Sequence, residues 1–213
     1  ALHIAYSLIL QAGYERAELG VVYPIARGSG PVLTILFATL LMGERISPGA
    51  LLGAFIVIAG IFVVTGNPFR SGSRPLQGML WGAATGTAIA GYTLWDGYSV
   101  ISLHLDPVRY YASTLLLQSL ILTPGAMRRR NRIPTAVRVD IIPILIIAVC
   151  SPLAYILVLT AMQSMPLALV APLRETSIIV GSLLSYWLFR ENHLARRIAG
   201  AVVVLTGIAI ISL

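Results

Sequence analysis

The feature that most constrains this chain is a series of long apolar runs separated by short gaps. The runs occupy about residues 1–14, 19–42, 48–66, 76–99, 108–126, 139–163, 167–189 and 195–213. An apolar stretch of about 20 residues is the length at which an α-helix crosses the roughly 30 Å hydrocarbon core of a bilayer. We therefore expect an all-α polytopic membrane helix bundle with about eight helices in this chain.

The composition supports this class of protein and excludes two others. Apolar residues make up 57% of the chain, and Asp, Glu, Lys and Arg make up only 11%. An ordinary soluble domain carries about 25% charged residues, and a water-soluble globule could not bury so much apolar surface. Disordered chains are polar and charged, so disorder is excluded as well.

The net charge of +7 does not indicate a nucleic-acid partner. All 15 basic residues are Arg, and most lie in the gaps between apolar runs, which is typical of loops that border a membrane. The single cysteine, Cys150, allows no internal disulfide and no cysteine-based zinc site. We expect the partners to be the lipid bilayer, a small-molecule substrate and a coupling proton, and the protein to be a monomer or weak dimer.

The chain contains an internal repeat, in which residues 19–66 align with residues 167–213. The matched positions are Pro24 with Pro172, Arg27 with Arg174, Glu44 with Glu191, Gly53 with Gly200 and Gly60 with Gly207, preceded by Tyr6 with Tyr155. Shared apolar composition does not explain a Pro, an Arg, a Glu and two Gly in one order. The repeat period is five runs, and an odd period inverts the second copy, as in many secondary transporters.

This repeat divides the chain into two parts. We expect residues 1–66 to form the last three helices of a first repeat, and residues 76–213 to form a complete second repeat of five helices. The runs at 76–99 and 108–126, in the second part, have no counterparts in the first. We therefore expect an N-terminally truncated ten-helix protein built from two inverted five-helix repeats.

Several stretches resemble those of a known family. They are residues 23–27, 43–45 and 53–60 in the first part, and residues 92–96, 171–175 and 190–191 in the second. In order, spacing and duplication they are similar to the drug/metabolite transporter superfamily, in particular its EamA-type branch of ten-helix proteins. The resemblance implies a carrier for small metabolites, often an exporter, with a central cavity between the two halves.

Three charged residues fall well inside the predicted helices: Arg27, Arg174 and Glu175. A charge inside a bilayer costs about 2.5–3.5 kcal/mol on insertion scales, so such residues indicate a functional site. We expect them to contact substrate near the midplane; the alternative is that Arg27 and Glu175 form a purely structural pair. Because adjacent helical residues point about 100° apart, we expect Arg174 to face the substrate and not to share the face of Glu175.

Aromatic side chains with a polar tip form a second group of candidates. Those inside the runs, which we expect to line the cavity or else to pack in the core, are Tyr6, Tyr23, Trp81, Tyr92 and Tyr155. Those near run ends, which predict an interfacial belt, are Trp95, Tyr98, Tyr110 and Tyr111. We expect Asp96 to be a solvated boundary residue, with proton coupling as the alternative, and Glu44 to be solvated or gate-like.

Proline and glycine positions predict where helices bend and where they pack. The prolines expected to kink helices or act as hinges are Pro24, Pro152 and Pro172. The glycines expected to let helices approach closely are Gly49 and Gly53 in one run and Gly78, Gly82 and Gly86 in another. We interpret both stripes as packing surfaces within the molecule.

These observations favour a secondary transporter over an enzyme. We find no catalytic motif, and we expect no catalytic residues, no metal and no cofactor. The predicted function is transport, specifically export, of small metabolites, amino acids or drug-like compounds, in a bacterial inner membrane. The alternative is a membrane-embedded lipid- or phosphate-handling enzyme or flippase, in which Arg27 and Arg174 would hold a phosphate.

Overall fold

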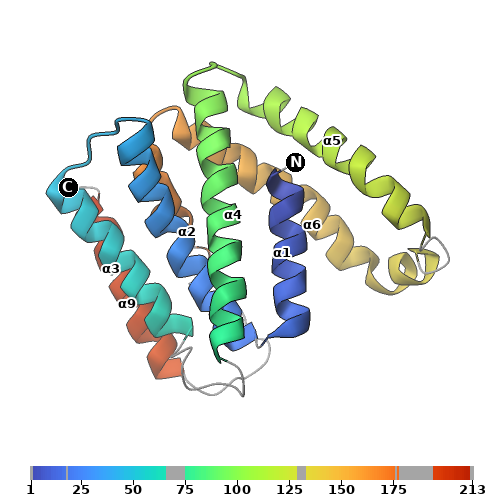
Figure 1. Cartoon of the computed structure of the whole chain (residues 1–213), viewed down its shortest axis with the longest axis horizontal. Helices are drawn as coiled ribbons and strands as arrows, with labels where there is room; N and C mark the ends of the chain where they lie inside the picture. Colours follow the sequence, from blue (N-terminus) through green and yellow to red (C-terminus); the bar gives the residue numbers. More distant parts are fainter. Residues whose placement is uncertain are drawn as a thin grey trace. The chain divides into compact units, whose positions relative to one another are not determined.

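The structure is a computed structural model that describes residues 2–17, 19–65, 75–128, 133–175, 177 and 194–211. Across these residues all regular structure is helical, as predicted. The helices are α1 (Leu2–Arg16), α2 (Leu19–Leu41), α3 (Pro48–Thr65), α4 (Pro75–Ile101), α5 (Pro107–Arg128), α6 (Ile133–Met162), α7 (Leu167–Arg174) and α9 (Leu194–Ile211) (Figure 1). Their bounds follow the apolar runs closely, although α6 begins earlier than expected and most of the run after residue 177 lies outside the described residues.

Local sequence sets where several helices begin. Pro48, Pro75 and Pro107 are the first residues of α3, α4 and α5, where a missing N–H removes no helical hydrogen bond. The Asp106 side chain accepts a hydrogen bond from the Arg109 N–H at 2.9 Å. Asp106 therefore caps α5 by satisfying a backbone donor that has no partner within the helix.

The described helices form two compact units. The larger contains Leu2–Trp95 and Met165–Leu213, and the smaller contains Asp96–Ser164. Helix α4 contributes most of its length to the larger unit and its last turns to the smaller. These units do not follow the expected boundary between the repeats, because α7 and α9 of the second copy pack with α2 and α3 of the first.

Helices α3 and α9 lie side by side in the larger unit (Figure 1) and approach closely at glycines. A Cβ atom added at Gly207 would lie 2.7 Å from the Gly53 carbonyl oxygen. A Cβ atom added at Gly60 would lie 3.1 Å from the Gly200 carbonyl oxygen. Gly53 thus faces Gly207 and Gly60 faces Gly200, so α3 and α9 run antiparallel. Because the repeat matches Gly53 with Gly200 and Gly60 with Gly207, it converts one contact into the other, which is the relation of a local two-fold axis.

The predicted glycine stripe of α4 packs against α2 within the same unit. A Cβ atom would lie 3.0 Å from the Val22 carbonyl oxygen if added at Gly82, and 3.1 Å from the Ala26 carbonyl oxygen if added at Gly86. Gly78 meets α2 one turn earlier. Because both partners advance by four residues, the two helices run parallel, and the missing Cβ atoms permit their close approach.

The stripe expected at Gly49 and Gly53 is wrong at its first member. Gly49 is exposed, and a Cβ atom there would approach only the Ser47 Oγ, at 4.0 Å. The stripe that packs against α9 runs through Gly53 and Gly60 instead. At about 100° per residue, Gly49, Gly53 and Gly60 share one face of α3. The close contact with α9 is made at Gly53 and Gly60, and it does not extend to Gly49 near the start of the helix.

The structure contains a break in α6, but not at the proline expected to cause one. In α6 the non-helical backbone is at Asp140, with φ −116° and ψ 27°, and not at Pro152, which lies within regular helix. Asp140 lies three residues before Pro143, whose ring displaces the preceding turn and removes a backbone donor. Pro172 is buried inside α7, and the side chain of Pro24 lies outside the described residues.

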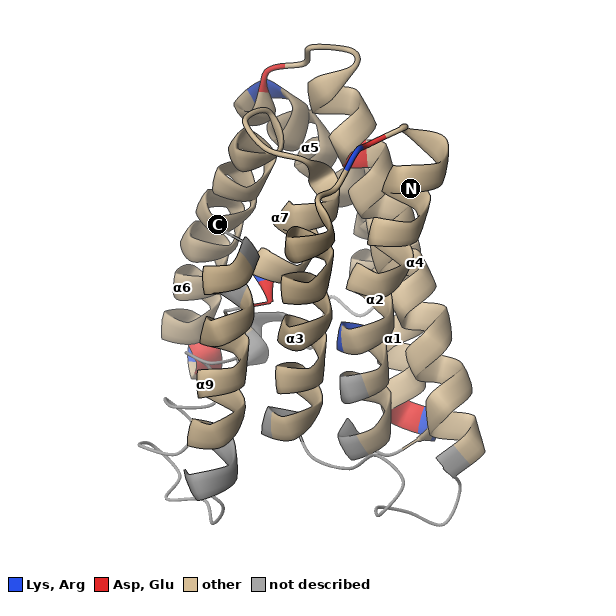
Figure 2. Ribbon diagram, turned by 90° about the vertical axis from the view of Figure 1, so that its left-hand side faces the viewer, with Lys and Arg blue, Asp and Glu red and all other residues tan. Residues whose placement is uncertain are grey.

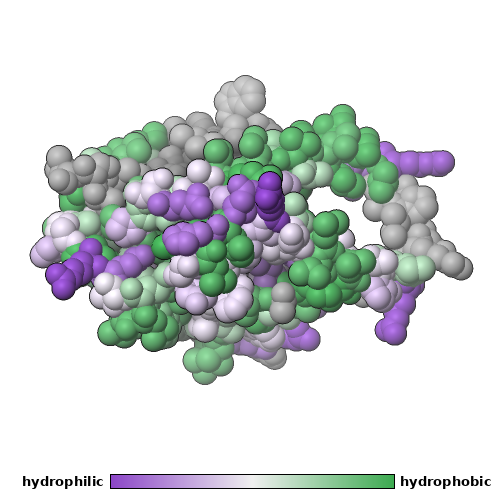
Figure 3. Space-filling view, turned by 90° about the horizontal axis from the view of Figure 1, so that it is seen from above, coloured by the Kyte–Doolittle hydropathy of each residue, from purple (hydrophilic) through white to green (hydrophobic). Residues whose placement is uncertain are grey.

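Much of the smaller unit presents apolar side chains on its surface. Described residues 137–150 of α6 are all exposed, as are Leu116, Leu117 and Leu120 of α5. Figure 2 shows that charged residues interrupt the ribbons at few places, and Figure 3 shows hydrophobic side chains over wide parts of the face it presents. Such surfaces are stable in lipid but not in water.

By length and composition, two of the described helices can cross a membrane. They are α2 over Val21–Leu41 and α6 over Val137–Met162. Shorter apolar segments cover Pro48–Val63 in α3 and Ile198–Gly207 in α9. Helices α4 and α5 are long enough but carry polar residues and glycine among their apolar ones, which lowers their hydropathy below that of α2 and α6.

Candidate functional site

Helices α2 and α7 bring two opposite charges together inside the larger unit. The Nη1 atom of Arg27 lies 3.1 Å from Oε2 and 3.4 Å from Oε1 of Glu175. The Glu175 side chain is 0% exposed and that of Arg27 is 28% exposed. Arg27 lies inside α2, and Glu175 is the C-cap residue directly after α7. Arg27 and Glu175 therefore form a part-buried ion pair, as in the alternative drawn from the sequence.

A second arginine reaches the same carboxylate. The Nη2 atom of Arg174 lies 3.6 Å from Oε1 of Glu175, and the Arg174 side chain is 14% exposed. The expectation that Arg174 points away from Glu175 is therefore wrong. Helix α7 ends at Arg174, and a long guanidinium side chain can turn back toward the next residue. One buried carboxylate lies between two guanidinium groups in the larger unit.

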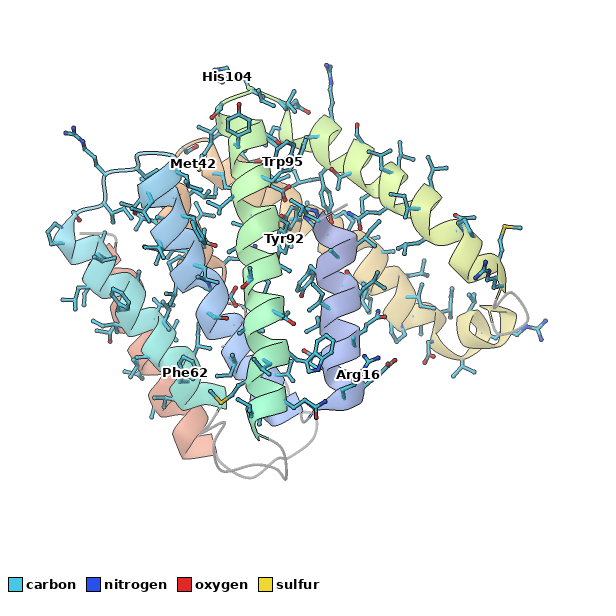
Figure 4. The ribbon with its side chains drawn as sticks, viewed as in Figure 1. Arg16, Met42, Phe62, Tyr92, Trp95 and His104 are labelled. Carbon is cyan, nitrogen blue, oxygen red and sulfur yellow. The ribbon has the colours of Figure 1, made fainter. Side chains whose placement is uncertain are left out.

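Aromatic rings extend this ionic cluster on both sides. The Arg27 guanidinium lies 5.4 Å from the ring centroid of Tyr23, and that of Arg174 lies 5.8 Å from the ring centroid of Tyr92. Both distances are within the range of a cation–π contact. The Tyr92 ring lies on α4 (Figure 4), with its centroid 5.4 Å from that of Tyr6 on α1.

Most of the predicted lining residues thus form one continuous set of contacts, which we call the charged–aromatic network. Its members are Tyr6, Tyr23, Arg27, Tyr92, Arg174 and Glu175, together with His3. His3 was missed by the sequence analysis. Its ring stacks on Tyr92 with centroids 4.5 Å apart. No local motif predicts that contact, because it joins α1 to the middle of α4.

Two predicted residues lie elsewhere. Trp81 is eleven residues before Tyr92, about 16 Å along α4, and the Arg16 guanidinium lies 5.4 Å from its ring centroid. Tyr155 lies in the smaller unit, where its hydroxyl group donates a hydrogen bond to Asp96. The repeat equivalence of Tyr6 and Tyr155 therefore does not extend to similar surroundings.

The network has the chemistry of a binding site for a small molecule. Guanidinium groups form strong charge-assisted hydrogen bonds with carboxylate and phosphate groups. Tyrosine rings offer apolar faces for flat or aliphatic parts of a ligand and a polar tip for hydrogen bonding. Among the described residues, no group of His, Cys, Asp and Glu side chains is arranged to hold a metal ion.

Glu44 contacts the opposite copy of the repeat. Its Oε1 accepts a hydrogen bond from the Leu167 N–H at 2.8 Å, and its Oε2 accepts one from the Ala168 N–H at 3.0 Å. The expectation of a solvated side chain is therefore wrong, whereas the gate-like alternative stays a prediction. The carboxylate binds two free backbone donors at the positive end of α7, which stabilises that helix start.

Asp96 was expected to be solvated, and the structure places it in a buried position instead. The residue is 1% exposed. Its Oδ1 accepts a hydrogen bond from the Tyr110 hydroxyl at 2.7 Å, and its Oδ2 accepts one from the Tyr155 hydroxyl. Tyr111 is also buried, with its ring centroid 4.8 Å from that of Tyr155. Tyr110 and Tyr111 thus face protein, whereas Trp95 and Tyr98 are exposed as the predicted belt requires.

The comparison with protein families identifies the group to which the chain is related. The family model described as the EamA-like transporter family matches residues 76–213. The chain belongs to the EamA-like transporter family. This finding confirms the resemblance seen in the sequence, and the helical structure agrees with it.

Two related proteins add to this picture. A protein of Pseudomonas aeruginosa named multidrug transporter PA4990 is 48% identical over 61 residues, which are 29% of this chain and 54% of that protein. The chain therefore spans about half the length of this curated relative. A solved crystal structure is similar over 98% of this chain and 73% of its own, with a TM-score of 0.77 and 16% identity. At that identity the likeness shows the fold alone.

In this member of the EamA-like transporter family, the matched residues include one part of the charged–aromatic network. Tyr92, Arg174 and Glu175 lie inside the matched segment, whereas Tyr23 and Arg27 come from the first copy of the repeat. The network thus joins side chains of both sequence copies. Membership of the family also makes this an integral membrane protein, which accounts for the exposed apolar surfaces of α5 and α6.

Proposed function

We propose that this protein is a secondary transporter that moves small molecules across a membrane, with the charged–aromatic network as part of its cargo site. The proposal rests chiefly on one observation. The buried carboxylate of Glu175 contacts Arg27 of α2 and Arg174 of α7, and these two arginines occupy equivalent positions of the sequence repeat. Charged groups inside membrane helices are costly, and they mark substrate and ion pathways when they occur.

The network favours cargo with an acidic group beside an apolar or aromatic part. Arg27 and Arg174 supply donors that suit a carboxylate, and Tyr23 and Tyr92 lie beside these donors. Amino acids and related small carboxylates fit this description. We propose such metabolites as the first class of cargo and drug-like compounds as the second, because the Pseudomonas relative is named a multidrug transporter.

We also propose that the direction is export and that the membrane is the inner membrane of a bacterium. The bacterial source of the relative supports a bacterial membrane, and export is what the resemblance to the EamA-type branch implies. The inverted repeat supports alternating access. When the two repeats exchange their conformations about the two-fold axis between α3 and α9, a site open to one side of the membrane becomes open to the other. Residues 1–66 and 76–213 remain the proposed repeat units.

The experiment that tests the function is counterflow in proteoliposomes containing the full-length protein. Vesicles are loaded with an unlabelled compound, and entry of the same labelled compound is followed, using leucine, phenylalanine and glutamate, and ethidium as a drug-like cation. We expect at least one compound to enter faster than into protein-free vesicles. Entry at the protein-free rate for every compound contradicts transport of these classes.

A matched pair of variants then links transport to the network. Arg27→Ala removes a guanidinium from the network, whereas Arg45→Ala removes one from an exposed position in the α2–α3 connection. We expect Arg27→Ala to reduce counterflow at least about tenfold, which corresponds to about 1.4 kcal/mol in the rate-limiting step. Arg45→Ala should match the unmodified protein. Equal counterflow in both variants contradicts a role for the network in cargo binding.

A further inference from the structure

We propose that Asp96, held between Tyr110 and Tyr155, is a proton-binding site that couples transport to proton movement. The inference rests on the proposed transport function but concerns a different place in the molecule. All three residues belong to the smaller unit, and they come from α4, α5 and α6. The charged–aromatic network, in contrast, belongs to the larger unit.

The Asp96 carboxyl group is buried near the end of a helix. Asp96 lies five residues before the end of α4, about 8 Å along the helix axis, and it is 1% exposed. A carboxylate held in this way within a membrane protein is costly, and buried carboxyl groups form the proton relays of many pumps and transporters. The short distance to the helix end keeps a path to water within reach.

The hydrogen-bond partners of Asp96 suit both of its protonation states. Tyr110 and Tyr155 each present a hydroxyl group, one to each oxygen of Asp96. A phenolic hydroxyl can both donate and accept, so either tyrosine can turn from donor to acceptor when the carboxyl group gains a proton. The site can therefore hold the carboxyl group with good hydrogen bonds in both protonation states.

Glu175 lacks this property. Its partners Arg27 and Arg174 carry guanidinium groups, which donate hydrogen bonds but cannot accept them. If Glu175 gained a proton, it would lose its charge attraction to both arginines. Its O–H group would also find no hydrogen-bond acceptor on either guanidinium group. Of the two buried carboxyl groups in the described residues, Asp96 is the one whose tyrosine partners suit proton exchange.

The surroundings within the smaller unit contain further groups that can titrate or carry charge. From α5, Tyr110 donates to the carboxylate and Tyr111 packs beside Tyr155 of α6. His104 and Asp106 lie in the exposed α4–α5 connection, and Arg109 is exposed in the first turn of α5. The Asp106 carboxylate is already used to cap α5. These exposed polar groups lie within 13 residues of Asp96 along the chain.

The coupling step needs no other reactant. The Asp96 carboxylate takes one proton from water on one side of the membrane and becomes a neutral carboxyl group. In the opposite conformation the O–H bond breaks, and the same proton leaves to water on the other side. Only one O–H bond forms and breaks, and no electron is transferred.

The first test compares transport with and without a pH gradient in proteoliposomes. The probe is whichever of leucine, phenylalanine, glutamate or ethidium shows counterflow. We expect an imposed gradient to raise accumulation several-fold in the unmodified protein, and the ratio with and without gradient to fall to about 1 in Asp96→Asn. The matched control is Asp106→Asn, which keeps a capping side chain. No gradient response in an unmodified protein that performs counterflow overturns the proposal, whereas absence of counterflow overturns the transport function instead.

The second test detects the proton directly and does not depend on transport. Infrared spectra of the full-length protein in lipid are recorded while the pH is changed. We expect a carbonyl stretch of a protonated carboxyl group that is missing in Asp96→Asn and present in Asp106→Asn. If Asp96→Asn does not fold, Tyr155→Phe serves in its place. It should shift the pH midpoint of the band, whereas Tyr14→Phe in the larger unit should not. A spectrum without any band that depends on Asp96 or Tyr155 overturns the proposal.

Discussion

Two carboxyl groups are buried in the described part of the chain, one in each compact unit, and different donors hold them. Glu175 lies between two guanidinium groups in the larger unit, and Asp96 lies between two phenolic hydroxyl groups in the smaller. Arginine fixes a carboxylate in its charged form because it can only donate. Tyrosine accepts either form. The comparison teaches that burial alone does not assign a role to a carboxyl group; the chemistry of its partners does.

The two units also differ in packing. In the larger unit, glycines bring α2 against α4 and α3 against α9 at distances that leave no space for a Cβ atom. In the smaller unit, Gly125 of α5 has no neighbour within 4 Å among the atoms that a Cβ would meet. The charged–aromatic network thus rests on closely packed helices, whereas Asp96 is supported by α5 and α6, which are largely exposed to lipid.

The largest effect is expected when one partner of the Arg27–Glu175 pair is removed. Either Arg27→Ala or Glu175→Ala leaves a buried charge with less compensation, which costs about 3–5 kcal/mol when a buried pair is broken. The double variant should lose less than the sum of the single losses. Thermal unfolding in detergent measures all three. Additive losses would contradict coupling between the two residues.

The packing difference predicts the next effect. Gly207→Ala places a Cβ atom 2.7 Å from the Gly53 carbonyl oxygen, so the helices must move apart. Overpacking of this kind costs about 1–3 kcal/mol. The matched variant Gly125→Ala meets no neighbour and should be neutral or stabilising by up to about 1 kcal/mol, since alanine favours helix. Equal unfolding temperatures for the two variants would contradict the difference between the units.

A smaller loss is expected at Asp96. Tyr155→Phe removes one hydrogen bond to the carboxylate, and hydrogen bonds between membrane helices contribute about 1 kcal/mol. In an Asp96→Ala background the same change should cost much less, because the acceptor is gone. Unfolding of the four proteins in detergent forms a double-mutant cycle. An unchanged cost in the Asp96→Ala background would show that the tyrosine acts elsewhere.

The smallest effects are expected at the two side chains that cap helices. Glu44 accepts two backbone N–H groups of α7, whereas Asp106 accepts one of α5. Glu44→Ala should therefore cost about 1 kcal/mol and Asp106→Ala about half of that. Chemical unfolding resolves this difference. A larger loss for Asp106→Ala would reverse the order that the hydrogen bonds predict.

The sequence predicted the helices and most of the network for physical reasons that can be named. Apolar runs of membrane-spanning length define helices directly, and the repeat placed Arg27 opposite Arg174 and its neighbour Glu175. The burial of Asp96 was not predicted, because its position near the end of a run indicates solvent, while its burial depends on tyrosines supplied by α5 and α6. Glu44 was missed for the same reason, since its partners lie more than 120 residues away. Contacts between distant helices leave no local signal in a single sequence.

The Gly49 prediction failed for a different reason. Gly49, Gly53 and Gly60 lie on one face of α3, within about 40° of one another. Spacing therefore does not show how far along this face the neighbouring helix reaches, and α9 comes close at Gly53 and Gly60 only. The repeat already contained a signal for this limit, because Gly53 and Gly60 have glycine equivalents in the second copy whereas Gly49 does not.

The central claim, that the charged–aromatic network binds cargo, is tested most directly by protection of introduced cysteines. Cys150 is exposed and is first replaced by alanine. Tyr6→Cys and Tyr23→Cys then report on the network, and Tyr98→Cys reports on an exposed site in the smaller unit. With a water-soluble thiol reagent, we predict that the compound active in counterflow slows labelling several-fold at positions 6 and 23 and leaves position 98 unchanged. Equal labelling rates with and without the compound at positions 6 and 23 would contradict the account.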